Sequence, residues 1–215
     1  MAESQHPAEP VGNAVGSFAV GAHAPGATPI DPDEAADLIP PTVRTLAELN
    51  AFEQVNITAA VEWLLRGARR ASVATVLSER YLLNLHHRMF DQTWRWAGEL
   101  RRTDKNIGVH WPQIRIALRE RLDDTRHWIS AKAHAPDEIA VRFHHAIVVI
   151  HPFPNGNGRW SRLAADALLH ALRKPLLTWG QSSLTAAGSA RTAYLAALRA
   201  ADQGDFTPLM AFARS

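Results

Sequence analysis

The fold and the chemistry of this chain both follow from one stretch, HPFPNGNGRWSR at residues 151–162. Its glycines let the backbone approach a ligand closely, and a helix that begins after them directs unpaired N–H groups and its positive dipole end at a bound anion. Arg159 and Arg162 lie three residues apart, so both guanidinium groups reach one polyphosphate. His151 precedes the turn and can exchange a proton near neutral pH. The stretch therefore predicts an active site that handles phosphate groups.

The segments around this stretch have helical periodicity, and only one has a different pattern. Residues 100–109 place the turn formers Asp104 and Asn106 between two short extended pieces, which predicts a small β-hairpin. The expected fold class is therefore all-α with one hairpin. The predicted helices cover residues 45–65, 76–89, 112–129, 137–150, 159–172, 185–200 and 205–214.

The composition predicts one folded domain with an N-terminal arm. A chain of 215 residues that is 47% hydrophobic and 20% charged can bury one good core. Residues 1–41 hold 7 of the 13 prolines and lack Lys and Arg, so we expect a disordered or loosely attached arm there and the domain at 42–215. Residues 42–215 carry all 23 Lys and Arg but only 15 of the 21 acids. This excess suits a polyphosphate or an acidic partner, and an ordinary Arg-rich surface explains it equally well.

The absence of cysteine excludes disulfides, thiolate catalysis and cysteine-based zinc sites. The first 40 residues lack the positive start and the apolar run of a secretory signal, and no apolar stretch approaches the ~20 residues that cross a bilayer. We therefore expect a cytoplasmic protein without a membrane partner. No sequence signature of specific nucleic-acid binding is present.

The stretch at 151–162 resembles the signature of the Fic/Doc family, His-x-Phe-x-(Asp/Glu)-Gly-Asn-(Gly/Lys)-Arg-x-x-Arg. The likeness extends to the early core helix and the Trp-Arg-Trp-Ala-Gly segment at 85–98, to the family's substrate-docking flap at 101–109, and to its closing helices at 194–209. It covers roughly residues 45–214, with the core at 76–214, and is nearest to the branch called mobile mystery protein B. The resemblance implies a Fic-type helical domain with a β-hairpin flap.

The resemblance also implies an enzyme that transfers a nucleotidyl group, usually AMP from ATP, to a Tyr, Thr or Ser hydroxyl of a protein, including its own. His151 would be the general base, and the Gly156, Asn157 and Gly158 region would hold the α-phosphate. Arg159 and Arg162 would hold the β- and γ-phosphates. The flap would dock the target backbone through its tip, Thr103, Asp104, Lys105, Asn106 and Ile107.

Asn155 departs from the family pattern, which has Asp or Glu there to bind Mg²⁺. A neutral amide offers one oxygen, whereas hard cations prefer charged carboxylates, so the metal should bind more weakly. The alternative is that the phosphates of the nucleotide hold Mg²⁺. A low-turnover nucleotide-binding regulatory or toxin-partner module is the second reading of function, and Asn155 favours it.

Glu53 is a candidate inhibitory residue. Many relatives carry a glutamate in the pattern (Ser/Thr)-x-x-x-Glu-(Gly/Asn), and Leu49-Asn50-Ala51-Phe52-Glu53-Gln54 occupies a similar place on a regulatory helix near 45–65. The pattern is incomplete, because the Ser/Thr is missing and Gln54 replaces the small residue. Glu53 is expected to pair with Arg162 and block the γ-phosphate, and a solvated surface glutamate is the alternative.

Two further histidines, His144 and His145, precede the stretch and raise the question of a metal cluster. Only His144 shares a helix face with His151, and the sequence offers no third ligand nearby. Histidines that are satisfied by hydrogen bonds within a helical protein are the commoner case. We therefore predict no zinc site there.

Overall fold

A computed structural model of the chain describes residues 35–67, 71–180 and 188–215. The described residues form helices and contain no strand, which confirms the predicted all-α fold. The helices are α2 (Leu46–Gly67), α3 (Val73–Val76), α4 (Glu79–Phe90), α5 (Ile114–Ser130), α6 (Pro136–Ile150), α7 (Asn157–Ala171), α8 (Ser189–Asp202) and α9 (Thr207–Ala213), with a 3₁₀ turn, η1 (Trp111–Gln113), before α5.

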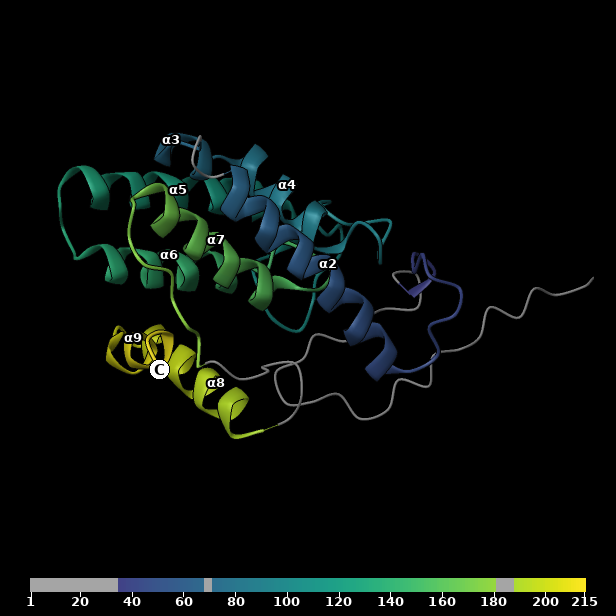
Figure 1. Cartoon of the computed structure of the whole chain (residues 1–215). Helices are drawn as coiled ribbons and strands as arrows, with labels where there is room; N and C mark the ends of the chain where they lie inside the picture. The colour runs from purple at the N-terminus through teal and green to yellow at the C-terminus, as the bar shows by residue number, and fades with distance from the viewer. Residues whose placement is uncertain (1–34, 68–70, 181–187) are drawn as a thin grey trace, which may run out of the picture.

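Helix α6 contributes side chains to two hydrophobic cores. Figure 1 shows this helix between α5 and α9. Ile139, Phe143 and Ile147 face the larger core, which α2, α3, α4, α5 and α7 complete. Ala140 and Val141 face a smaller core formed with α8 and α9. Since side chains on two faces of α6 leave water, burial fixes this helix firmly and with it the stretch that follows.

Short capping interactions set where the early helices begin. The Ser72 hydroxyl accepts from the Thr75 N–H at the start of α3, and the Ser78 hydroxyl accepts from the Tyr81 N–H at the start of α4. Each hydroxyl satisfies a backbone donor that the first helical turn leaves unpaired. The sequence predicted one helix across 76–89, whereas the structure ends the short helix α3 at Val76 and begins α4 after Ser78.

Asp166 on α7 fixes the segment that follows this helix. Its Oδ1 accepts from the Leu177 N–H at 3.0 Å, and its Oδ2 accepts from the Trp179 Nε1–H at 3.1 Å. Burial raises the pKa of Asp166 to about 6, against the lowering effect of these two hydrogen bonds. The carboxylate thereby holds the segment that leads from α7 toward α8.

The predicted hairpin at 100–109 is not seen, because a buried arginine takes the place of a strand ladder. Arg101 is 3% exposed, and its guanidinium donates to the carbonyls of Thr103, Val109, Ile150 and His151. Backbone hydrogen bonds then run to the motif loop and not across a hairpin, from Arg101 to Pro152 and from Val109 to Ile150. Since one side chain satisfies these carbonyls, the segment folds as a series of bends.

The predicted arm lies mostly outside the described residues. Its last part, residues 37–39, is attached: the Ile39 N–H donates to the Thr93 carbonyl at 2.9 Å and the Arg95 N–H donates to the Asp37 carbonyl at 3.0 Å. Residues 37–39 are therefore held against the folded domain, although the predicted arm extends to residue 41. Among the described helices, none has the length and apolar character needed to cross a membrane.

Candidate active site

The motif loop joins α6 to α7 and bends sharply at both ends. His151 ends α6 in the left-handed region with φ 53°, and Gly156 precedes α7 with φ 78°. A Cβ added at Gly156 would lie 2.5 Å from Cζ of Phe90, so both the backbone angle and the packing require glycine. The loop thus fixes where α7 begins. The N–H groups of the first helical turn have no partner within the helix and are suited to bind an anion.

Asn157 holds the loop together from inside. Its Oδ1 accepts from the Phe153 N–H at 2.9 Å, and its Nδ2 donates to the Phe153 carbonyl at 2.9 Å. The Asn157 side chain is 2% exposed. Its amide was expected to meet the α-phosphate, and the structure instead commits that amide to the loop, which leaves the backbone N–H groups to face a ligand.

His86 supports the loop from α4, a role that the sequence analysis missed. Its ring stacks on Phe153 with centroids 3.6 Å apart, its Nδ1 accepts from the Gly98 N–H at 2.9 Å, and its Nε2 lies 3.1 Å from the Asn155 carbonyl. Because Nδ1 accepts, Nε2 carries the proton and donates to that carbonyl. Burial lowers the pKa of His86 to about 3, so the ring stays neutral.

His151 is a buried and neutral base. It is 7% exposed, and its pKa falls to about 4 through burial first and then through the charges of Arg101 and Lys105. Arg101 donates from Nε to the His151 carbonyl at 2.7 Å. A Cβ added at Gly108 would lie 2.6 Å from Cβ of His151, so the 100–109 segment packs directly against this histidine.

The bent loop that carries the expected flap tip therefore packs beside His151 through Gly108, and the charge of Lys105 acts on the histidine. Asp104 fixes that loop, because its Oδ1 accepts from the Trp111 N–H at 2.8 Å and its Oδ2 lies 2.7 Å from Nδ1 of His110. Thr103, Asn106 and Ile107 are exposed, and Ile107 keeps 46% of its surface in solvent. The loop offers an exposed edge next to the base.

Glu53 meets the motif, but at Arg159 and not at the expected Arg162. Its Oε2 lies 2.7 Å from Nη1 of Arg159, and its Oε1 accepts from the Trp94 Nε1–H at 2.8 Å. The carboxylate is 3% exposed, so the surface alternative is wrong. A charge pair at this depth is screened less than a surface pair.

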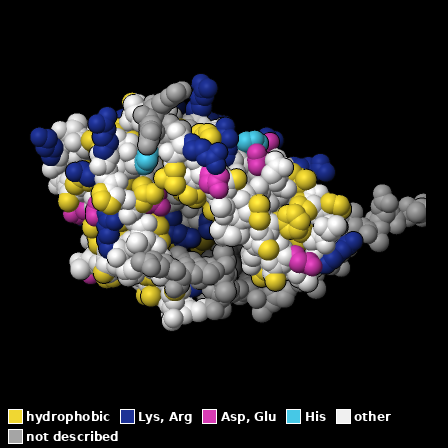
Figure 2. Space-filling model, in the orientation of Figure 1, with side chains coloured by type: hydrophobic (Ala, Val, Ile, Leu, Met, Phe, Trp, Pro, Cys, Tyr) yellow, Lys and Arg dark blue, Asp and Glu magenta, His cyan; other side chains and the backbone are white. Residues whose placement is uncertain are grey.

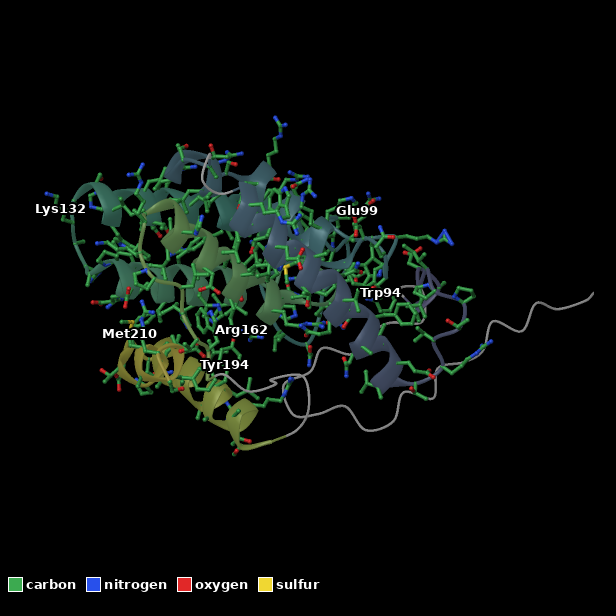
Figure 3. The ribbon with its side chains drawn as sticks, in the orientation of Figure 1. Trp94, Glu99, Lys132, Arg162, Tyr194 and Met210 are labelled. Atoms are coloured by element: carbon green, nitrogen blue, oxygen red, sulfur yellow. The ribbon has the colours of Figure 1, made fainter. Side chains whose placement is uncertain are left out.

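Arg162 faces the other side, toward α8. Its guanidinium carbon lies 5.2 Å from the Tyr194 ring centroid, and burial lowers the pKa of Arg162. Figure 2 shows Lys and Arg side chains within a hollow of the drawn face, and in the same orientation Figure 3 labels Arg162 and Tyr194 next to each other there. The two motif arginines are thus held from opposite sides.

The site has few donors for a metal ion. Within the described ranges, no group of three His, Cys, Asp or Glu side chains lies close enough to hold one. The Oδ1 of Asn155 accepts from the Gly156 N–H inside the loop. One neutral oxygen in a local hydrogen bond does not fit a magnesium ion held by the protein alone, so any such ion would arrive as part of the nucleotide substrate.

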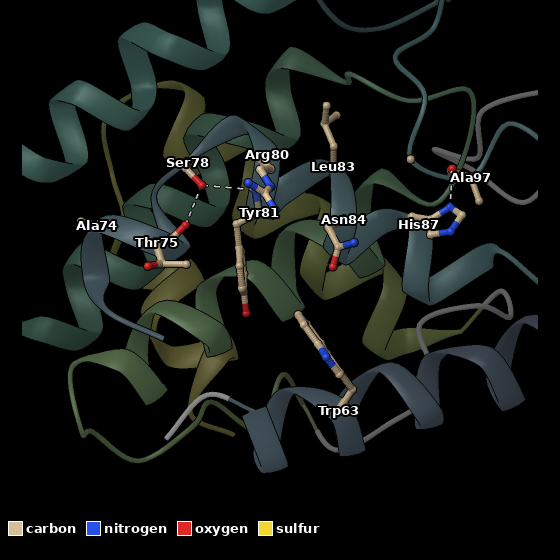
Figure 4. Close-up of a pocket in the computed structure, with 11 residues that line it drawn as sticks. Trp63, Ala74, Thr75, Ser78, Arg80, Tyr81, Leu83, Asn84, His87 and Ala97 are labelled. Atoms are coloured by element: carbon tan, nitrogen blue, oxygen red, sulfur yellow. Dashed lines mark hydrogen bonds between the residues drawn. The ribbon is translucent and has the colours of Figure 1, made fainter. Parts of the chain in front are cut away.

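A separate cavity of about 850 Å³ lies away from this loop, between α2, α3 and α4 (Figure 4). Its lining combines the aromatic rings of Trp63 and Tyr81 with polar groups such as Asn84 and His87. None of the motif residues lines it. The cavity does not bear on the chemistry of His151 and the two arginines.

Comparison with known proteins identifies the motif and its surroundings. The sequence model of the Fic/DOC family matches residues 76–169. The protein adenylyltransferase Fic of Drosophila grimshawi is 30% identical over 135 residues, 61% of this chain and 26% of that protein. The enzyme of the same description from Aedes aegypti is 32% identical over 120 residues, 54% of this chain and 22% of that protein. The chain thus spans about a quarter of the length of these curated relatives.

Solved structures agree on the fold. Fic-1 of Caenorhabditis elegans superposes with a TM-score of 0.55 at 24% identity, over 75% of this chain and 46% of that one. The N-terminal Fic domain of a cell filamentation protein from Bartonella quintana gives a TM-score of 0.61 at 18% identity, over 80% of this chain and 84% of that one. Residues 76–169, the part of the chain that contains the motif, thus match the Fic/DOC family, and the fold agrees with that match.

Proposed function

We propose that this chain transfers the AMP group of ATP to a Tyr, Thr or Ser hydroxyl of a target protein. The observation that carries the proposal is a neutral, buried His151 placed just before a helix whose first turns present Arg159 and Arg162. The relatives described as protein adenylyltransferases support it, as does BepC of Bartonella tribocorum, a structural neighbour that was solved with bound AMPPNP.

The chemistry needs one base and a positive site. His151 takes the proton of the target hydroxyl, and the hydroxyl oxygen forms a bond to the α-phosphorus of ATP. The bond from that phosphorus to the bridging α–β oxygen breaks, so pyrophosphate leaves and AMP stays on the protein. The N–H groups at Gly158 and its neighbours meet the α-phosphate, while Arg159 and Arg162 balance charge on the leaving phosphates.

Magnesium enters this scheme as part of the substrate, ATP·Mg²⁺. Asn155 stands where the family signature has an acid, and its amide oxygen is the group that would face the ion. Replacing it by a carboxylate supplies the charged oxygen that hard cations prefer. The proposal therefore expects a high magnesium requirement in the natural chain.

Glu53 is proposed to restrain the enzyme. It occupies Arg159, and a bound nucleotide has to compete with this carboxylate for the same guanidinium. Because Trp94 also donates to Glu53, the carboxylate is held in place for that competition. The loop tip at 103–107, beside His151, is proposed to dock the target backbone without demanding a sequence.

The test is to incubate the full chain and a cell lysate with ATP labelled either at the α- or at the γ-phosphate. We expect the α label, and not the γ label, to become attached to protein. His151→Ala should reduce this by roughly 10²–10⁴-fold, since that is the usual contribution of a general base. His127→Ala is the matched control, because His127 is an exposed histidine on α5. Equal labelling by the His151→Ala variant and the natural chain would contradict the proposal.

A second candidate function is a nucleotide-binding regulatory or toxin-partner module with little turnover. Asn155 favours it, because a neutral amide already bonded to the Gly156 N–H is a weak ligand for a cation. This candidate predicts that ATP binds while no α label is transferred at any magnesium concentration. The branch of the family, self-modification, the cytoplasmic location and the lack of nucleic-acid binding stay predictions.

A further inference from the structure

The cavity between α2, α3 and α4 has the size and the lining of a small-molecule site. Its volume of about 850 Å³ falls in the usual range for such sites, and polar groups interrupt an aromatic lining. Trp63 from α2 and Tyr81 from α4 extend toward the same space, with ring centroids 5.9 Å apart and planes tilted by 32° (Figure 4). A flat ring that enters the cavity therefore has two aromatic side chains to pack against.

The wall of this cavity is held by contacts of its own. The Ser78 hydroxyl accepts from the Tyr81 N–H at 3.2 Å, which fixes the start of α4. His87 donates from Nδ1 to the Ala97 carbonyl at 3.0 Å, since a carbonyl only accepts. Gly98 has φ 84°, and a Cβ there would lie 2.8 Å from Cβ of His87, so this turn packs closely on α4. These contacts make the cavity a preformed one.

The charges around the cavity favour an anion. The described residues that line it include Arg80 and contain no Asp or Glu. Arg88 adds a second positive charge close by, because its guanidinium carbon lies 4.4 Å from the Trp63 ring centroid. Acids next to lining residues in the sequence already form ion pairs, Glu62 with Arg66 and Glu79 with Arg115. A negative group in the cavity would therefore meet attraction from the arginines and little repulsion.

Two lining side chains offer further hydrogen-bond donors. Oδ1 of Asn84 accepts from the Nε–H of Arg88 at 3.1 Å, so the amide NH₂ of Asn84 is the group that can serve a ligand. The Tyr81 hydroxyl makes no hydrogen bond with another described residue, and burial raises the pKa of Tyr81 to about 12. It therefore keeps its proton at neutral pH and can donate it. Both donors suit an oxygen acceptor such as a carboxylate.

We propose that this cavity is a second binding site, for a flat aromatic molecule that carries a carboxylate or a comparable anionic group. The ring packs against Trp63 and Tyr81, and the anionic group meets the guanidinium of Arg80. The site is distinct from the proposed nucleotide site, because no residue of the motif lines the cavity.

The cavity takes no part in the chemistry at His151, but it shares α2 with Glu53. A ligand that contacts α2 and α4 together stabilises the arrangement in which Glu53 lies 2.7 Å from Arg159. This step rests on the proposed function, in which Arg159 has to leave Glu53 to meet a phosphate. The cavity ligand and ATP should then weaken the binding of each other.

The first test measures binding to the full chain by calorimetry, with naphthoate as the probe. Naphthol is the matching neutral ring, and cyclohexanecarboxylate is the matching anion without an aromatic ring. We expect naphthoate to bind more tightly than either one by roughly tenfold, because only naphthoate uses both the aromatic rings and Arg80.

Variants of the cavity separate the two contributions. Arg80→Ala should weaken naphthoate binding by roughly tenfold and leave naphthol binding within about twofold, because it removes only the charge-assisted contact. Trp63→Leu keeps an apolar side chain on α2 and should weaken both naphthalene probes by roughly fivefold. Arg119→Ala and Trp111→Leu are the matched controls, since both residues are exposed and lie outside the cavity.

Naphthoate that binds no more tightly than cyclohexanecarboxylate would overturn the proposal. Equal weakening of naphthoate binding in Arg80→Ala and in Arg119→Ala would overturn it as well, because the anion would then have no specific place in the cavity.

The second test measures ATP binding by calorimetry with and without saturating naphthoate. ATP affinity should fall by a few fold in the natural chain and stay unchanged in Glu53→Gly, where α2 no longer holds Arg159. An equal fall in Glu53→Gly would overturn the link to α2, since naphthoate would then compete at the nucleotide site itself. The proposed function fails separately: a chain that shows this antagonism but transfers no AMP keeps the second site and loses the transferase activity.

Discussion

The two sides of the candidate site hold their arginines by different chemistry. On the α2 side, Glu53 engages Arg159 with a full negative charge at 2.7 Å. On the α8 side, the uncharged ring of Tyr194 lies 5.2 Å from the guanidinium carbon of Arg162, and the Tyr194 hydroxyl lies 3.0 Å from Nε2 of His144. A carboxylate competes with phosphate for its arginine, whereas an uncharged aromatic ring packs against its arginine without neutralising it. Arg159 is therefore paired with an anionic side chain on the α2 side, whereas Arg162 packs against an uncharged side chain on the α8 side.

The difference predicts opposite signs for changes on the two sides. Removing Glu53 on the α2 side should free Arg159 for a phosphate. Removing Tyr194 on the α8 side should leave Arg162 less well fixed. The side chains of Glu53 and Tyr194 are both buried, so solvent should not screen the effect of removing either one.

Glu53→Gly should raise the rate of AMP transfer by roughly tenfold or more at limiting ATP, because Arg159 no longer has to leave an ion pair to meet a phosphate. The gain should vanish when Arg159→Ala is added, since both changes act on one contact. Transfer of α-labelled AMP is measured in the three variants and the natural chain. Glu62→Gly, an exposed glutamate change on the same helix, serves as the control.

Equal rates in Glu53→Gly and the natural chain would remove the restraint on the α2 side. A gain that persists with Arg159→Ala but disappears with Arg162→Ala would show that Glu53 acts through the arginine expected from the sequence. Either outcome changes the contrast between the two sides.

Acid should destabilise the fold, because buried histidines on both sides stay neutral in it. The pKa is lowered to about 3 for His86 and about 4 for His151, and well below its ordinary value for His144. Below about pH 6.5 the unfolded chain binds protons that the folded chain does not, so the free energy of unfolding should fall as the pH drops from 7 to 4, on the order of a few kcal/mol in all.

Denaturant unfolding at several pH values measures this slope. His144→Phe should flatten it, since one of the three groups no longer takes up a proton on unfolding. At pH 8 all three histidines are neutral in both states, so this variant reports only packing there. A slope that His144→Phe leaves unchanged would contradict a buried, neutral His144 beside Tyr194.

The helices and the motif loop could be predicted from the sequence because their causes are local. Apolar periodicity marked every described helix except the short α3 within a few residues of its observed bounds, and the left-handed position at Gly156 follows from the glycine itself. The family was also correctly identified from the motif. Interactions within a turn or a helix can be inferred from neighbouring residues alone.

The contacts across the site could not be predicted, because they depend on how helices cross. The bent loop at 100–109 exists because Arg101 reaches carbonyls about 50 residues away, at Ile150 and His151. The partner of Glu53 is Arg159 and not Arg162, a difference of one helical turn that α2 packing decides. His86 offered a weak signal, as a histidine on the apolar face of a predicted helix.

Asn155→Asp should lower the magnesium concentration needed for half-maximal transfer by a few fold, because a carboxylate adds a charged oxygen ligand. The maximal rate should stay equal or rise. Magnesium titrations of the two chains with α-labelled ATP measure this, and the comparison with Glu53→Gly shows whether metal and arginine limit the rate independently. Loss of activity at every magnesium concentration would assign Asn155 a positive role through its hydrogen bond to Gly156.

Gly158→Ala should produce the smallest change, and it probes the space between the two sides. The added Cβ would lie 3.7 Å from Nη1 of Arg162 and 3.9 Å from the Tyr194 hydroxyl, which are ordinary contact distances, so the fold accepts it. Alanine inside a helix should raise the free energy of unfolding by about 0.5–1 kcal/mol.

The methyl group that Gly158→Ala adds would lie at the first turn of α7, where a phosphate is proposed to approach the backbone N–H groups. We therefore expect ATP affinity to fall by a few fold while thermal stability rises. Calorimetric binding and thermal unfolding of one sample separate the two effects. If ATP binds as tightly to Gly158→Ala as to the natural chain, the phosphates do not approach the first turn of α7 between Arg162 and Tyr194. The α2 and α8 sides would then not act on one bound nucleotide.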